Sequence, residues 1–166
     1  MSSVPAYTLL ALVVLQRGAE LIYSRRNVRA LKARGGIEHG RLHYPVLVAL
    51  HVSWLIAMAL AIRRNPVIYW LPVSLFALLQ LLRIWVLATL DGWWTTRIIT
   101  LPDAPLVTRG PYRYVRHPNY LVVAGEVAIL PLAFGQIAIA VFFSGLNLMV
   151  LAWRVHVENA ALAPRR

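Results

Sequence analysis

The sequence predicts an all-α integral membrane protein: five transmembrane helices with a folded cytoplasmic loop between the third and the fourth. Of its 166 residues, 60% are hydrophobic, whereas soluble domains usually carry about 45–50% apolar residues. The apolar residues form runs that are long enough to cross a hydrocarbon core, which takes about 20 residues of helix. The length of the chain favours one domain, residues 1–166.

The first three helices are expected over residues 4–23, 42–62 and 66–90, where the apolar runs lie. The apolar stretch after Pro118 is too long for a fourth, single helix. From residue 119 to 153 it would extend about 52 Å at 1.5 Å per residue, whereas the hydrocarbon core is about 30 Å thick. Pro131 and Gly135 break it, which gives helices over 119–132 and 136–157.

Basic residues between the apolar runs predict the orientation. Positive residues concentrate in cytoplasmic connections, and here they favour the first and third connections and the C-terminal tail over the second connection. We therefore expect the N-terminus outside and the C-terminus in the cytoplasm. The first connection holds Arg25, Arg26, Arg29, Lys32, Arg34 and Arg41, the second Arg63 and Arg64, the third Arg97, Arg109, Arg113 and Arg116, and the tail Arg154, Arg165 and Arg166.

Composition also limits the function classes. A net charge of +11 would suggest nucleic acid in a soluble protein, but charges placed between apolar runs describe membrane topology, so no nucleic-acid partner is expected. The absence of cysteine excludes disulfides and thiolate metal sites. Residues 1–16 carry no charged side chain, unlike the start of a cleavable signal peptide.

Several ionisable side chains interrupt the apolar runs, where a charge is costly unless it has a partner or faces a cavity. Arg17 and Glu20 share a helix face and are expected to neutralise each other. Arg83 either extends to the lipid headgroups or lines a pocket under the long loop. Glu126 could pair with it structurally, or both could contact the substrate.

Two other polar positions leave a structural reading open beside a functional one. His51 is expected to be a hydrogen-bonded packing residue, because no second ligand lies at metal spacing, and no metal is expected. Arg154 and Glu158 are four residues apart on one helical face and could form an exposed salt bridge. Both, however, leave a long apolar helix at the boundary where the long loop ends.

The third connection, residues 91–118, is long, rich in proline and nevertheless rich in aromatic and aliphatic residues, which predicts a folded segment packed on the helix ends. Its last part has turns at Gly110-Pro111 and His117-Pro118, and Pro118 suits the first position of a helix. Aromatic residues there alternate with cations. Aromatic faces attract a cation and helix-start amides an anion, so the segment could hold S-adenosylmethionine (SAM) or form an interfacial belt.

Two separated motifs resemble the isoprenylcysteine carboxyl methyltransferase family. The run Leu106 to Tyr112 with Arg116-His117-Pro118-Asn119-Tyr120 is similar to its most specific element, and Arg154 to Leu162 is similar to its second motif. Residues 82–93 also resemble its third-helix region. The second motif usually contains two glutamates, whereas this chain has Glu158 followed by Asn159. The resemblance covers about residues 75–162 and implies a methyltransferase.

The resemblance implies SAM as the cofactor and S-adenosylhomocysteine as its product. It also implies roles for individual residues. Arg154, His117 and Glu158 would be catalytic, and Arg154 would face the acceptor oxygen, with Arg83 and Glu126 as further candidate substrate residues. The implied cofactor-binding residues are Leu106, Val107, Gly110, Tyr112, His117, Pro118, Asn119, Tyr120, Glu158 and Asn159.

The N-terminal part resembles a bacterial subgroup linked to type III polyketide synthases and to O-methylation of alkylpyrones or alkylresorcinols, which implies the bacterial inner membrane. The expected function is SAM-dependent O-methylation of a lipophilic acceptor that carries a carboxylate or an acidic enol or phenol. The alternatives are a phospholipid N-methyltransferase, an NADPH-dependent membrane reductase and a non-enzymatic scaffold. The subgroup signs are Glu20, Ser24, Arg26, Asn27, Gly35, Gly36, Glu38, His43-Tyr44-Pro45 and His51.

Overall fold

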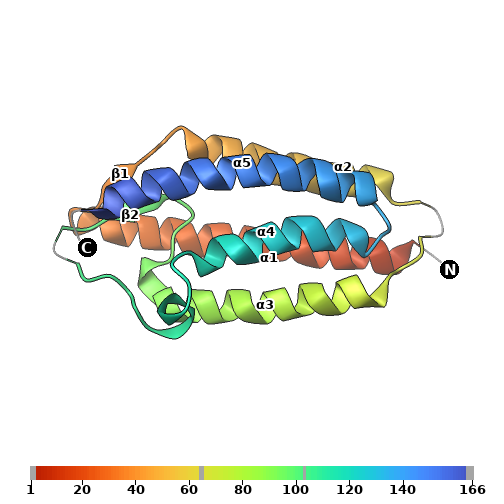
Figure 1. Ribbon diagram of the computed structural model, residues 1–166, viewed down its shortest axis with the longest axis horizontal. Coiled ribbons are helices and arrows are strands. Elements are labelled where there is room, and N and C mark those ends of the chain that lie inside the picture. The colour runs from red at the N-terminus through yellow and green to blue at the C-terminus, as the bar shows by residue number, and fades with distance from the viewer. Residues whose placement is uncertain (1–2, 64–65, 103, 164–166) are drawn as a thin grey trace.

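The computed structural model describes residues 3–63, 66–102 and 104–163. In these residues five helices run alternately up and down in one bundle (Figure 1). Helices α2 and α5 lie together along one side, α3 lies along the other, and α4 packs against both α3 and α5. The helices are α1 (Val4–Ala33), α2 (His43–Ala61), α3 (Trp70–Leu90), α4 (Pro118–Leu132) and α5 (Ile137–Leu162).

Four of the helices, α1, α2, α3 and α5, are long and apolar enough to cross a membrane. The remaining helix, α4, has 15 residues. At 1.5 Å per residue it is only about 22 Å long, less than the roughly 30 Å of a hydrocarbon core. The expected five helices are therefore present in the described chain, and α4 is shorter than a full crossing.

The ends of the bundle differ. We call the end where α1, α3 and α5 finish the loop end, because residues 34–42 and 91–117 connect the helices there. The opposite end, where α4 meets α5, is the hairpin end. There, the backbone N–H of Tyr69 donates to the carbonyl of Ala133 at 3.0 Å, which joins the start of α3 to the end of α4.

Three helix boundaries correct the prediction. Helix α1 continues to Ala33 instead of ending near residue 23, because residues 24–33 are mostly good helix formers and the chain first turns left-handed at Gly35 (φ 88°). Helix α5 likewise continues to Leu162, beyond residue 157. Helix α3 begins at Trp70 instead of residue 66, because the chain before it is extended at Tyr69.

A small sheet corrects the all-α prediction. Strand β1 (Ile37–His39) pairs antiparallel with β2 (Ile98–Thr100), with Glu38 opposite Ile99. The strands have three residues each, too few for an alternating pattern to be recognised in the sequence. This sheet ties the first connection to the third at the loop end, and both strands pack against α5.

The apolar core fills the inside of the bundle. His51 bonds the carbonyl of Leu47 through Nδ1 at 2.9 Å and packs edge-on against Trp54, so its predicted packing role is confirmed. The buried core residues that touch one another are Ala6, Leu10, Val13, Leu50, Trp54, Met58, Phe76, Val127, Leu130, Phe134, Phe143 and Val150.

Nearer the loop end, the core gives way to a buried ionic cluster of Arg17, Glu20, Arg83 and Glu126. Arg83 donates from Nε to Glu126 at 2.9 Å and makes a second, short contact with the same carboxylate. Arg17 bridges Glu20 at 2.7 Å and Glu126 at 2.8 Å. The predicted Arg17–Glu20 and Arg83–Glu126 pairs therefore both form, and together they fasten α1 to α3 and α4.

Candidate functional site

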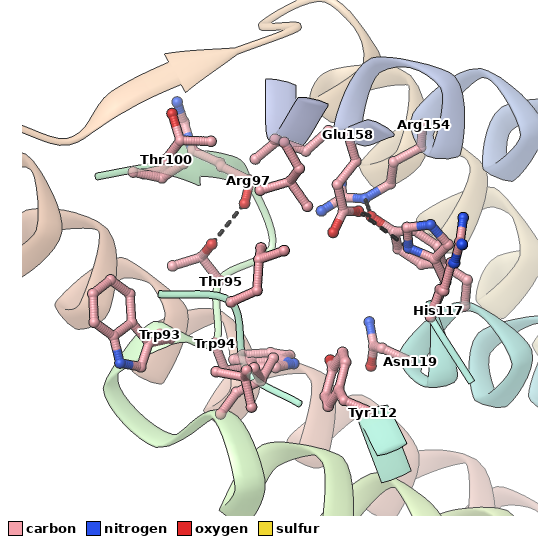
Figure 2. Close-up of a pocket in the computed structure, with 18 of the residues that line it drawn as sticks. Trp93, Trp94, Thr95, Arg97, Thr100, Tyr112, His117, Asn119, Arg154 and Glu158 are labelled. Carbon is pink, nitrogen blue, oxygen red and sulfur yellow. Dashed lines mark hydrogen bonds and ion pairs between the residues drawn. The ribbon is translucent and has the colours of Figure 1, made fainter. Parts of the chain in front are cut away.

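A pocket of about 340 Å³ lies at the loop end, within the range of about 300–1,000 Å³ that is usual for ligand sites. Figure 2 shows two facing walls. One is formed by Trp93–Thr100, and the other by the start of α4 and the end of α5. Leu90 at the end of α3 and the loop residues Pro105–Thr108, Tyr112 and Arg116 complete the lining.

The α4–α5 wall is built around the hydroxyl of Tyr120. Arg154 donates to this oxygen from Nε at 2.7 Å, and the hydroxyl in turn donates to the carboxylate of Glu158. The guanidinium also lies over the Tyr120 ring, 5.4 Å from its centre. Arg154 is only 4% exposed, and its Nη1 has no hydrogen-bond partner among the described residues. The wall thus holds a fixed cation with a donor left for a ligand.

His117 joins the same wall. Its ring stacks on Tyr120 with centres 5.4 Å apart and planes at 16°. Its Nδ1 lies 3.9 Å from Glu158, and its Nε2 lies 3.3 Å from Oδ1 of Asn159. Asn159, which stands where the resembled motif usually has a second glutamate, therefore contacts His117 and does not line the pocket.

Two residues shape the surroundings of the pocket without lining it. Gly110 has a φ of 59°, and a Cβ there would come within 2.4 Å of Oγ1 of Thr89. The missing side chain lets the short helix η2 (Gly110–Arg113) pack on the end of α3. Pro118 is buried at the first position of α4, where its fixed φ suits a helix start.

Tyr112 extends from η2 to the pocket. Burial raises the pKa of the Tyr112 phenol, and the negative charge of Glu158 raises that pKa further. The hydroxyl is therefore neutral at physiological pH. It offers the pocket an aromatic face and a neutral polar group instead of a second anion beside Glu158.

The facing wall, Trp93–Thr100, was not among the predicted site residues. It contains the end of the short helix η1 (Asp91–Trp93) and strand β2. Strand β2 is held by β1, and His39 bonds Oγ1 of Thr100 at 2.8 Å. Two sequence signals reached this wall. Residues 82–93 resemble the family's third-helix region, and the proline-rich loop retains aromatic and aliphatic residues; the second signal indicated folding, and neither indicated a binding role.

Glu38 secures this strand pair. It accepts hydrogen bonds from Lys32 at 2.5 Å and Arg97 at 2.6 Å, and its side chain is only 3% exposed. Burial alone would raise the pKa of Glu38, but the two cations outweigh it and hold this pKa below its ordinary value of 4.5. The ion pairs of Glu38 with Lys32 and Arg97 therefore stabilise the pocket wall at neutral pH.

Acid is expected to cancel this contribution. A carboxyl whose pKa is lowered on folding stabilises the protein above its unfolded pKa and loses that effect as the pH falls through the lower, folded pKa. Glu38→Gln should therefore have a lower Tm than the wild type near neutral pH, and the two Tm values should converge below pH 4.5. Thermal unfolding in detergent measures both, and a constant difference down to strong acid would contradict the assignment.

The structure brings most, but not all, of the predicted site residues together. Gly110, Pro118 and Asn159 support the pocket from outside, and Arg83 and Glu126 belong to the ionic cluster instead of the lining. No cluster of candidate metal ligands occurs in residues 3–63, 66–102 and 104–163. The predicted residues that line the pocket are Leu106, Val107, Tyr112, His117, Asn119, Tyr120, Arg154 and Glu158.

The residues that line this pocket all fall within the part of the chain that matches a family model. The family model described as "Isoprenylcysteine carboxyl methyltransferase (ICMT) family" matches residues 71–164. The chain is 35% identical to uncharacterized protein YpbQ of Bacillus subtilis, over 94% of this chain and 95% of that protein. It is 27% identical to an uncharacterized protein of Haemophilus influenzae, over 92% of each chain. No solved structure matches.

Proposed function

Because the chain belongs to the isoprenylcysteine carboxyl methyltransferase family, we propose that it transfers a methyl group from SAM to an oxygen of a lipophilic acceptor. Membership makes it an integral membrane protein and a methyltransferase in general terms. The observation that supports the specific proposal is the buried Arg154 with an unpaired Nη1 in the pocket wall. A guanidinium so placed is suited to an anionic oxygen.

The pocket residues fit SAM, which would supply an electrophilic methyl on its sulfonium. Tyr112 and Trp94 offer aromatic faces to a cation, whereas the Tyr120 ring already contacts His117 and Arg154. Two buried polar atoms, Oδ1 of Asn119 and Nε1 of Trp94, lack partners in the described chain and are available to a polar ligand. Leu106 and Val107 would offer backbone groups, as the family resemblance implies.

The reaction needs the acceptor oxygen about 3 Å from the methyl group and in line with the bond that breaks, and holding this geometry supplies much of the catalysis. Arg154 would hold the oxygen through charge-assisted hydrogen bonds. A carboxylate or an acidic enol is already ionised at neutral pH and needs no base. A phenol would need one, and His117 or Glu158 would then accept its proton.

The acceptor would be lipophilic because the pocket lining includes apolar side chains at the ends of two apolar helices, among them Leu90 and Leu162. Its chain would enter sideways from the bilayer. Following the basic residues of the loop end, we place this end in the cytoplasm, where SAM is present, and the N-terminus outside. The bacterial relatives support the inner membrane of a bacterium.

Within this function, alkylpyrones and alkylresorcinols are the proposed acceptors, as the bacterial subgroup implies. A phospholipid N-methyltransferase is the nearest alternative. Its acceptor is an amine headgroup, and the Arg154 guanidinium with its unpaired Nη1 favours an oxygen anion over an amine. Analysis of the labelled lipid product separates N- from O-methylation.

Ligand-induced stabilisation tests the donor. S-adenosylhomocysteine at millimolar concentration is expected to raise the Tm of the detergent-solubilised protein, because a ligand at 100 times its Kd stabilises the folded state by about 2.7 kcal/mol. NADPH is the matched control and should leave the Tm unchanged. A shift with NADPH alone would favour a reductase, and no shift with either ligand would favour a scaffold.

A further inference from the structure

The loop end of α1 packs against the pocket wall that the prediction missed. Three of its side chains, Tyr23, Ser24 and Asn27, contact residues 91–96, and we call these three the α1 clamp. Ser24 and Asn27 are 1% and 5% exposed. The clamp lies outside residues 71–164, the region that the family model matches. It is therefore contributed to the site by a part of the chain that carries none of the family motifs.

Asn27 holds the wall by its backbone. Its Nδ2 donates to the carbonyl of Asp91 at 3.1 Å and to the carbonyl of Trp94 at 2.8 Å. Asp91 has a φ of 45°, which a residue with a Cβ rarely adopts. Such a conformation costs of order 1–3 kcal/mol and persists where the surroundings fix it. The side chain of Asp91 also accepts a hydrogen bond from Tyr23 at 2.9 Å.

Trp94 is the residue that this arrangement presents to the pocket. Its ring stacks on Tyr23 with centres 6.0 Å apart, and Figure 2 shows it beside Tyr112 and across the pocket from Arg154. Trp94 is 3% exposed, and its Nε1 has no acceptor within the described part of the chain. A buried N–H without an acceptor is costly, and a ligand in the pocket is placed to accept from it.

We propose that Asn27 is a positioning residue for the methyl donor: it fixes the turn from Asp91 to Trp94 so that the Trp94 indole N–H donates to the bound donor. This inference rests on the proposed function. It adds a ligand-binding residue, Trp94, that no motif contains, and a residue that acts on it from α1. The N-terminal helix thereby takes part in donor recognition as well as in crossing the membrane.

The test is the Kd of S-adenosylhomocysteine, measured by isothermal titration calorimetry on the full chain. Asn27→Leu keeps the branched shape of the side chain and removes the donor, and we expect a roughly tenfold higher Kd. Trp94→Phe keeps the ring and removes the N–H, with a similar effect expected. Both substitutions remove the same hydrogen bond from Trp94 to the ligand. The Kd of the double variant should therefore rise no more than that of the weaker-binding single variant, instead of by the product of the two increases.

The matched control is Met58→Ala, which destabilises the apolar core without touching the pocket lining. It should lower the Tm and leave the Kd unchanged. A wild-type Kd for Asn27→Leu, multiplicative losses in the double variant, or an equal rise of the Kd in Met58→Ala would each overturn the inference.

If Asn27→Leu does not fold, Ser24→Ala replaces it, since Ser24 accepts from the Thr96 backbone N–H at 2.8 Å. Absence of binding to the wild type would instead refute the proposed function.

Discussion

Replacing Glu126 by alanine is expected to lower the free energy of unfolding by about 3–5 kcal/mol. The carboxylate is 2% exposed and binds both Arg83 and Arg17. Its removal leaves two buried guanidinium groups with only Glu20 to neutralise them, in a part of the molecule where water cannot replace the lost partner. The measurement is reversible unfolding in mixed micelles, followed by circular dichroism.

A double variant distinguishes a structural role of this cluster from the substrate role predicted for Arg83 and Glu126. Arg83→Met with Glu126→Leu removes one cation and one anion and leaves Arg17 paired with Glu20 at 2.7 Å. Replacing a buried ion pair by apolar residues is often neutral or stabilising, so the double variant should be more stable than Glu126→Ala. If it folds but cannot methylate lipid, the substrate role is supported; if it keeps activity, the cluster serves the fold alone.

Arg154→Ala is expected to reduce methyl transfer roughly 10²- to 10³-fold, the usual cost of removing one donor that stabilises a reacting oxygen. Membranes containing the variant would be incubated with radiolabelled SAM and a bacterial lipid extract, and the label in the lipid phase counted. Because Arg154 is assigned to the acceptor, stabilisation by S-adenosylhomocysteine should survive the substitution. That retained shift also shows that the variant is folded.

Arg113→Ala is the control for this substitution. Arg113 is an exposed arginine of η2 that does not line the pocket, so its removal takes away the same charge at the same end of the bundle. It should leave the transfer rate unchanged. Equal losses of transfer rate in the two variants would mean that the rate depends on the total positive charge of the loop end and not on the position of Arg154. The role assigned to Arg154 would then be wrong.

The sequence alone determined the helices and one wall of the pocket. Apolar runs of spanning length are a local property of the chain. The sequence therefore located most of the helix ends to within a few residues, the end of α1 being the main exception. His117, Tyr120, Arg154 and Glu158 could be proposed because two motifs resembled a known family. These four residues do line one pocket.

Only the tertiary structure decided the other wall and the partners of the buried charges. Arg17 and Glu126 are 109 positions apart, and Glu38 meets Arg97 through three-residue strands with no pattern of their own. In the sequence Asn27 was one sign of the bacterial subgroup with no contact assigned to it, and in the structure it is buried against the turn that presents Trp94. Such contacts depend on where the helices bring distant segments together, and helix periodicity in the sequence does not record that.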